Sequence, residues 1–167
     1  MSLGDEVQVF DNHLYKLRRI RQIVGHQLST STIDTVILGE TLKTADVVIG
    51  ALRAEKSRVR HVISEEMVRN MKTDSLIIDL SIDQGGCVAT SEITTHSKPV
   101  FRKYDVIHYC VPNVASRVAH SATTALSNIF TPTILRAAEE GGVEEMIFSH
   151  KWFMKGVYAY KGSLTNE

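Results

Sequence analysis

The chain has 167 residues, of which 43% are hydrophobic and 23% charged, a composition typical of a globular domain large enough to bury a core. Lysine plus arginine and aspartate plus glutamate both number 19, so the formal net charge is zero. This balance argues against recognition of nucleic acid or of an anionic membrane through bulk charge. The sequence has no apolar run near the roughly 18–20 residues of a membrane helix and no signal-peptide pattern at its start, so we expect a cytoplasmic protein.

The cysteine and histidine content indicates neither a disulfide framework nor a metal site. Cys87 and Cys110 are the two cysteines, and we expect them to be buried free thiols. The seven histidines lack the spacing of metal ligands. We therefore expect no metal.

The first elements predicted are a strand at 6–10, where strand-forming residues alternate, and a helix from 14 to 24, where apolar residues recur every three or four positions. A short strand is expected within 26–30. A second helix is predicted at 34–43, with Val36, Ile37 and Leu42 facing inward.

Three apolar runs then follow, at 46–51, 75–80 and 106–111. Continuous apolar runs of this length are typical of strands covered on both faces, as in a parallel sheet. Ser64 is positioned to cap a helix that continues to Met71.

Beyond residue 114 the pattern becomes helical. We expect a helix at 115–130 that breaks or kinks near Pro132, and a second at 133–140 that stops at Gly141-Gly142. The tail, at about residues 143–167, is aromatic and less regular, which suggests a surface that packs against another part of the protein.

Alternation of strands and helices predicts an α/β fold, a Rossmann-like doubly wound parallel sheet of three αβα layers. We place an incomplete dinucleotide-binding domain at residues 4–130 and a helical, aromatic extension at 131–167.

Ligands bind such sheets at the carboxyl ends of the strands. Asp11 ends the first strand, where an acid accepts hydrogen bonds from the adenosine ribose hydroxyls and repels a 2′-phosphate. A helix N-cap is an equally good explanation of Asp11. The usual partner of this acid is a G-x-G-x-x-G loop roughly 20 residues upstream. Only ten residues precede Asp11, so we expect the sheet's first strand and its glycine-rich loop to be missing through an N-terminal truncation.

Two further strand ends carry polar side chains. Asp83 lies in Ile-Asp-Gln-Gly-Gly-Cys, where it could form the turn through its own backbone or act as a carboxylate near a nicotinamide ring. Asn113 could cap the following helix or bind a nicotinamide or substrate group.

Six blocks together resemble the cofactor domain of the alanine dehydrogenases, a family to which the transhydrogenase alpha subunit is related. They are Val-Phe-Asp-Asn, Ala-Asp-Val-Val-Ile-Gly-Ala, Glu-Glu-Met-Val-Arg-Asn-Met-Lys, Ile-Asp-Gln-Gly-Gly-Cys, Thr-Thr-His-Ser-Lys-Pro-Val and His-Tyr-Cys-Val-Pro-Asn. The resemblance covers about residues 4–140.

The resemblance implies the NAD-binding portion of an oligomeric enzyme that converts L-alanine reversibly to pyruvate and ammonium. It implies Asp83 as the catalytic carboxylate. The cofactor-binding positions that it implies are Asp11, Thr32, Ala51, Leu52, Ile82, Asp83, Val111, Asn113 and Val114.

The sequence departs from the family after Leu52, where a Pro-Gly-Ala-Lys-Ala-Pro type of loop is often found and this chain has Arg-Ala-Glu-Lys-Ser-Arg. The family's catalytic His and its substrate-binding Arg and Lys belong to an N-terminal half absent here, so we expect the isolated chain to be inactive. The alternatives are a non-catalytic, dimerising Rossmann-like module and another dehydrogenase or transhydrogenase of the wider family.

Overall fold

The computed structural model describes residues 6–24, 28–53 and 61–165. The chain divides into two compact units, Met1–Val114 and Ala115–Glu167, which are described separately. The boundary expected between residues 130 and 131 falls inside a helix of the second unit.

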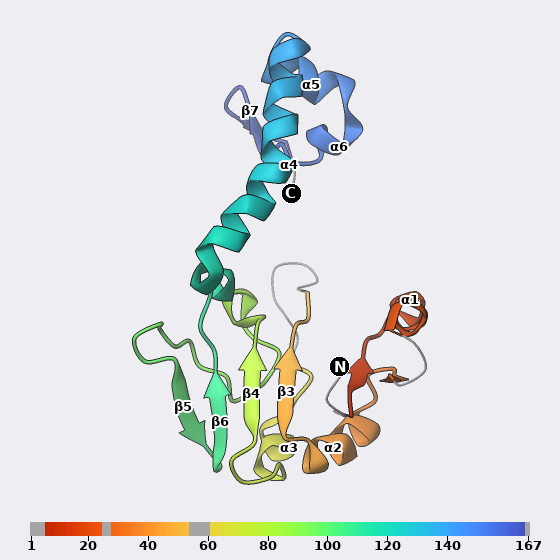
Figure 1. Cartoon of the computed structure of the whole chain (residues 1–167), viewed down its shortest axis with the longest axis vertical. Helices are drawn as coiled ribbons and strands as arrows, with labels where there is room; N and C mark the ends of the chain where they lie inside the picture. Colours follow the sequence, from red (N-terminus) through yellow and green to blue (C-terminus); the bar gives the residue numbers. More distant parts are fainter. Residues whose placement is uncertain (1–5, 25–27, 54–60, 166–167) are drawn as a thin grey trace. The chain divides into compact units, whose positions relative to one another are not determined.

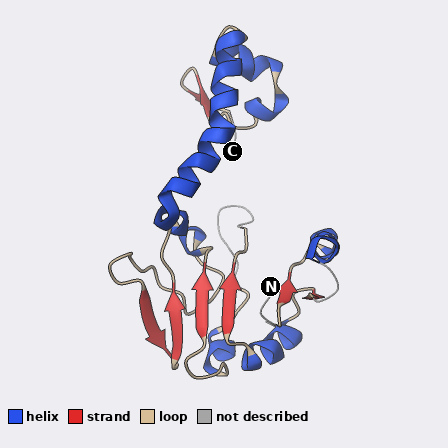
Figure 2. Ribbon diagram, viewed as in Figure 1, coloured by secondary structure: helices blue, strands red, loops and turns tan. Residues whose placement is uncertain are grey.

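The first unit alternates strands with helices, as the sequence predicted (Figures 1 and 2). Its elements are β1 Gln8–Phe10, α1 Leu14–Val24, β2 Ser29–Ser31, α2 Thr35–Thr44, β3 Val47–Gly50, α3 Glu65–Arg69, β4 Leu76–Asp79, the 3-10 helix η1 Ile82–Gln84, β5 Val100–Lys103 and β6 Val106–Tyr109. The 3-10 helix η2, Val114–Val118, runs from this unit into the next.

The strands form two separate parallel arrangements. β1 pairs with β2, and a four-stranded sheet has the order β3-β4-β6-β5, in which β3, β4 and β6 are parallel. Among the described residues, no strand joins β1 to β3. β5 was not predicted, and it pairs antiparallel with β6 at the sheet edge.

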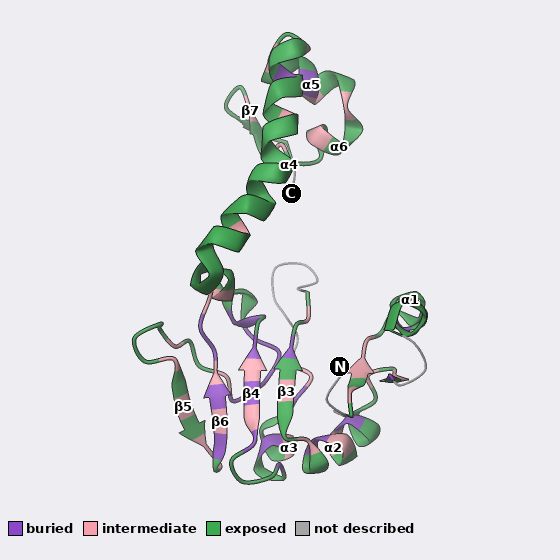
Figure 3. Ribbon diagram, viewed as in Figure 1, coloured by how far each residue is buried: buried purple, intermediate pink, exposed green. Residues whose placement is uncertain are grey.

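The two faces of the four-stranded sheet differ in burial, and β3 is its most exposed parallel strand (Figure 3). Leu38 and Leu42 of α2 and Val68 of α3 form the core with Ile77 of β4 and Val106 of β6. Burial alternates along the strands, so that the opposite face of β3 exposes two large apolar side chains, those of Val47 and Ile49.

The predicted helix at 34–43 is present, but the prediction of which residues face inward was partly wrong. Asp34 caps it by accepting hydrogen bonds from the backbone N–H groups of Val36 and Ile37. Leu42 is buried as predicted, and Leu38 is buried with it, whereas Val36 and Ile37 are exposed. Positions 38 and 42 lie one turn apart on one face of the helix, whereas positions 36 and 37 point to other sides of it.

His108, in the centre of β6, is fully buried. Its Nδ1 lies 3.1 Å from the carbonyl of Val106 and its Nε2 lies 2.8 Å from the hydroxyl of Thr90. A carbonyl only accepts, so Nδ1 carries the proton and Nε2 accepts from Thr90. The ring stacks on Phe101 of β5 at 4.8 Å, which ties the antiparallel edge strand to the sheet.

The second unit is mainly helical. It contains α4 Ala119–Glu139, α5 Val143–Ser149, α6 Lys151–Met154 and a hairpin of β7 Ala159–Tyr160 with β8 Ser163–Leu164. Of the break or kink predicted near Pro132, the break is wrong, because α4 continues through the proline; the kink stays a prediction. Asn128, four residues earlier, is exposed, so water can satisfy the carbonyl whose bond the proline removes.

The predicted stop at Gly141-Gly142 is confirmed. Both glycines have positive φ, and the Gly142 N–H donates to the Ala137 carbonyl at 2.7 Å, which closes the helix end. Across the described residues, no helix combines the length and hydropathy needed to cross a bilayer.

The register of α2 gives a testable difference between two neighbouring side chains. Leu38→Ala removes a buried side chain and should lower the free energy of unfolding by about 2–5 kcal/mol. Val36→Ala changes an exposed side chain, and its effect should stay within about 0.5 kcal/mol. Urea denaturation followed by circular dichroism measures both, and equal losses would contradict the observed register.

Candidate cofactor and active site

The predicted site residues all follow the carboxyl ends of strands. Ala51 and Leu52 follow β3, Ile82 and Asp83 follow β4, and Val111 to Val114 follow β6. Because β3, β4 and β6 are parallel, these residues share one edge of the four-stranded sheet (Figure 1). Asp11 and Thr32 occupy the corresponding ends of β1 and β2, which form the separate pair.

The turn that carries Asp83 is built around a different carboxylate, that of Asp79 at the end of β4. Asp79 is 1% exposed, and a buried carboxylate is tolerated only when hydrogen bonds replace its water. Its hydrogen-bond donors are the backbone N–H groups of Ser81, Cys87 and Val88, at 3.0, 2.9 and 3.3 Å, and the hydroxyl of Ser91, at 2.8 Å. Asp79 thereby holds both ends of the segment 81–88.

Two glycines make room for this arrangement. A Cβ on Gly86 would lie 2.9 Å from Oδ2 of Asp79, and Gly86 has a φ of +75°, which favours glycine. A Cβ on Gly50 of β3 would lie 2.3 Å from Sγ of Cys87. The space that a side chain at Gly86 would need is therefore taken by the Asp79 carboxylate.

Cys87 and Cys110 are both buried free thiols, as expected. Burial and, after it, the neighbouring Asp79 carboxylate together raise the pKa of the Cys87 thiol to about 12. Burial also raises the pKa of Cys110. Both thiols therefore stay neutral near pH 7, so neither is an activated nucleophile.

Asp83 lies in η1 and is exposed, whereas its neighbour Ile82 is buried. The turn closes through bonds from the Gln84 N–H to the Ser81 carbonyl and from the Gly85 N–H to the Ile82 carbonyl. The backbone thus anchors the turn on its apolar side and presents the Asp83 carboxylate to solvent.

After β6, Val111 is buried and Val114 is half-buried, and Asn113 is exposed between them. Asn113 has a φ of +52°, a left-handed conformation that asparagine adopts more readily than most residues. The turn therefore places a polar amide at the sheet edge that Asp83 also occupies.

Asp11 is a partly exposed carboxylate with close neighbours of its own. One oxygen accepts from the backbone N–H and ring Nδ1 of His13, at 2.7 and 2.9 Å, and Lys16 lies 3.4 Å from the other. Partial burial raises the pKa of Asp11, but the His13 hydrogen bonds and the Lys16 charge outweigh it and lower the pKa overall. The side chain thus closes a local turn just before α1, which begins at Leu14.

The remaining predicted positions have less polar character. Thr32 and Ala51 are exposed, and Leu52 packs against the core cluster. The departure from the family pattern after Leu52 lies mostly at residues 54–60, outside the described residues. In the described ranges, no group of three or more His, Cys, Asp or Glu side chains could hold a metal ion.

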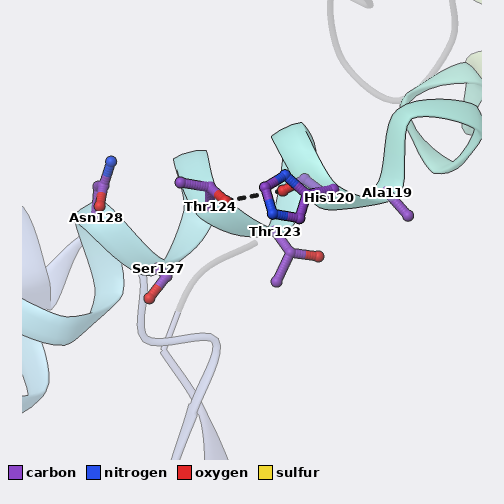
Figure 4. Close-up of a pocket in the computed structure, with 6 residues that line it drawn as sticks. All are labelled: Ala119, His120, Thr123, Thr124, Ser127 and Asn128. Atoms are coloured by element: carbon purple, nitrogen blue, oxygen red, sulfur yellow. Dashed lines mark hydrogen bonds between the residues drawn. The ribbon is translucent and has the colours of Figure 1, made fainter.

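An open hollow in the second unit contains none of the predicted residues. Figure 4 shows its lining along α4: Ala119, His120, Thr123, Thr124, Ser127 and Asn128. The hydroxyl of Thr124 donates to the His120 carbonyl at 2.9 Å. All six side chains come from one helix, so these residues alone do not enclose a ligand.

Asp79 is the residue that sequence reasoning missed, because it was counted as part of an apolar strand. The available signal was an acidic residue at the end of the buried run Leu-Ile-Ile, where a charge needs partners.

Two carboxylates four residues apart should respond differently to the same substitution. Asp79→Asn replaces an acceptor oxygen with an amide that cannot accept the N–H bonds, and we expect a loss of at least about 3 kcal/mol in the free energy of unfolding. Asp83→Asn alters an exposed side chain and should change stability by less than about 0.5 kcal/mol. Thermal and urea denaturation of both variants provides the comparison, and a tolerant Asp79→Asn variant would refute the anchoring role.

Comparison with known proteins identifies the family of the chain. The family model described as "Alanine dehydrogenase/PNT, C-terminal domain" matches residues 1–167. The alanine dehydrogenase of Bacillus subtilis is 36% identical over 147 residues, which cover 87% of this chain and 39% of that protein. The enzyme of Mycolicibacterium smegmatis is 34% identical over 166 residues, covering 99% of this chain and 44% of that protein.

Solved structures of the same family also match the chain. An L-alanine dehydrogenase superposes with a TM-score of 0.87 and 30% identity, over 97% of this chain and 44% of that one. A transhydrogenase from Sinorhizobium meliloti, at a TM-score of 0.54 and 21% identity over 71% of this chain and 40% of that one, shares the fold. The chain spans less than half the length of these relatives, and the fold is the Rossmann-like α/β fold predicted. The chain therefore belongs to the alanine dehydrogenase/PNT family and corresponds to its C-terminal domain.

Proposed function

We propose that this chain is the NAD-binding portion of an L-alanine dehydrogenase, an enzyme that converts L-alanine reversibly to pyruvate and ammonium. The observation that carries the proposal is the gathering of Ala51, Asp83 and Asn113 at the carboxyl edge of one parallel sheet, in a chain of this family. Ligands of doubly wound sheets bind along that edge. When bound, NAD would accept the hydride from the alanine α carbon.

Asp11 fits a role in holding the adenosine ribose. It follows a strand of the parallel pair and keeps a partly exposed carboxylate whose lowered pKa leaves it charged at neutral pH. The Lys16 contact at 3.4 Å joins a half-exposed lysine to a carboxylate that is one quarter exposed, and it costs little to displace. A charged carboxylate accepts hydrogen bonds from ribose hydroxyls and repels a 2′-phosphate, which favours NAD over NADP.

Asp83 fits a role beside the reacting atoms. Its exposed carboxylate can accept a proton from the substrate amine or hold that nitrogen in place. The buried side chain of Ile82 anchors the same turn to the protein interior. Thr32, Leu52, Val111 and Val114 would line the path of the cofactor, and Asn113 would bind an amide or carboxylate group.

The working enzyme is further proposed to be a cytoplasmic homo-oligomer. Its support lies in α4, where apolar side chains recur at helical spacing and are more than half exposed. These side chains are Leu126, Ile129, Phe130 and Ile134. Continuous apolar surface of this kind typically marks a protein contact.

The catalytic role of Asp83 can be tested in a complete enzyme. Residues 4–140 of this chain replace the matching region of the Mycolicibacterium smegmatis alanine dehydrogenase, and alanine-dependent formation of NADH is followed by absorbance. The chimera should be active, and Asp83→Asn should lower kcat by about 10²–10⁴-fold, the usual contribution of a general acid–base group. An active chimera that is insensitive to Asp83→Asn would refute the role.

The cofactor proposal can be tested on the chain itself by NMR titration. The sequence contains no G-x-G-x-x-G loop, so we expect no turnover with alanine and NAD binding weaker than about 1 μM. NAD should nevertheless shift the amides of Asp11 and Ala51 more than NADP does, and Asp11→Asn should remove that difference.

Asp46→Asn is the matched control for this titration, because it makes the same charge change just before β3, at the amino end of the strand. Equal responses to the two cofactors in the unmodified chain would overturn the assignment of Asp11. Tight binding of NAD would contradict the expectation that the chain alone binds this cofactor weakly.

A further inference from the structure

His61 makes a hydrogen bond to the turn that carries Asp83. Its ring Nε2 lies 3.2 Å from the carbonyl oxygen of Gly85, the residue that directly follows η1. A carbonyl oxygen only accepts, so Nε2 carries the proton and donates it. His61 follows β3 in the chain and Gly85 follows β4, and the two strands are parallel neighbours. The bond therefore joins two connections at the carboxyl edge of the sheet.

The backbone that carries His61 is fixed beside this turn by bonds of its own. The N–H groups of Val62 and Ile63 both donate to the Cys87 carbonyl, at 2.9 and 3.2 Å. Ile63 is buried and forms a parallel bridge with Val88. The imidazole of His61 is exposed, but the main chain next to it is held in place.

The peptide group between Gly85 and Gly86 is the part of the turn that depends most on such a bond. Both glycines have positive φ, +105° and +75°, and glycine populates positive and negative φ about equally well. This peptide group can therefore reverse its orientation at little steric cost. In the observed orientation its N–H donates to the Ser81 carbonyl at 3.0 Å, and its carbonyl accepts from His61. The two bonds hold both polar ends of one peptide group.

The Asp79 carboxylate cannot do the same work. It accepts hydrogen bonds from N–H groups at the two ends of the segment 81–88, and the carbonyl of Gly85 lies between those ends. A carboxylate has no proton to donate to a carbonyl. The middle of the turn needs a donor from another segment, and the side chain of His61 supplies one.

We propose that His61 is a positioning residue for Asp83. Its Nε2–H holds the peptide group between Gly85 and Gly86 in the orientation that keeps the turn closed, and the closed turn fixes the Asp83 carboxylate at the sheet edge. Without this bond the peptide group reverses part of the time and the Gly86 N–H leaves Ser81. The effect on the turn stands by itself, whereas its consequence for catalysis rests on the role proposed for Asp83.

The effect on the turn is measured on the full chain by amide hydrogen exchange. His61→Leu removes the donor and should speed exchange of the Gly86 amide by about threefold to tenfold, the usual contribution of one hydrogen bond. Exchange of the Cys87 amide, which donates to Asp79, should stay the same. His61→Gln keeps an N–H donor at a similar reach and should restore the slow exchange of the Gly86 amide.

The matched control is His120→Leu, the same change at an exposed histidine of α4 in the second unit, which should leave the Gly86 amide unaffected. Unaltered Gly86 exchange in His61→Leu, equal acceleration at Cys87, or failure of His61→Gln to restore the slow exchange would overturn the proposal. Fast exchange throughout β4 in His61→Leu would also overturn it, because the role would then be one of general stability.

The effect on catalysis is measured in the chimera with the Mycolicibacterium smegmatis enzyme. His61→Leu should lower kcat for alanine by about threefold to tenfold and leave the KM for NAD nearly unchanged, and His61→Gln should restore kcat. A raised KM for NAD with an unchanged kcat would indicate direct contact with the cofactor and refute positioning. Insensitivity of the chimera to Asp83→Asn would refute the proposed function instead, and the exchange of the Gly86 amide distinguishes the two failures.

Discussion

The buried carboxylate of Asp79 is the interaction on which the candidate active site depends. A charge in the interior is costly, and it is offset here by three backbone N–H groups and a hydroxyl that converge on two oxygens. Those donors belong to a segment that would otherwise be a loose glycine-rich loop. The carboxylate therefore turns the end of a strand into a defined platform.

On that platform, the carboxylate that stabilises the structure and the carboxylate proposed for catalysis lie only four residues apart. Asp79 faces inward, fully bonded, and Asp83 faces solvent on the turn that Asp79 holds. Gly50 and Gly86 are required for the same reason, since side chains there would occupy the space of Cys87 and of Asp79 itself. The chemistry proposed for Asp83 would gain a rigid support, because the backbone of the turn is held by another carboxylate.

The sequence predicted the buried strands of the sheet better than the exposed ones. β3, β4 and β6 were found because each is a continuous apolar run, although in the structure Val47 and Ile49 of β3 are exposed on one face. β5 was missed because Val-Phe-Arg-Lys has two apolar residues followed by two charged ones, so it contains neither a continuous apolar run nor an alternating one. The strand-end rule located Asp83 and Asn113 at one sheet edge, but no local pattern separates the turn-building acid from the exposed one. That distinction depends on contacts between residues 8 to 12 positions apart.

The neutral imidazole of His108 makes the stability of this fold fall at low pH. Burial is the main cause that lowers the pKa of His108, and the hydrogen bond to the Val106 carbonyl only partly opposes it. In the unfolded chain the same ring binds a proton near pH 6.5. The stabilisation is therefore complete above that value and is lost as the pH falls toward the lower pKa of the folded state. Protonation would remove the acceptor that Thr90 needs and leave a charge stacked on Phe101, so acid should loosen the antiparallel edge before the parallel strands.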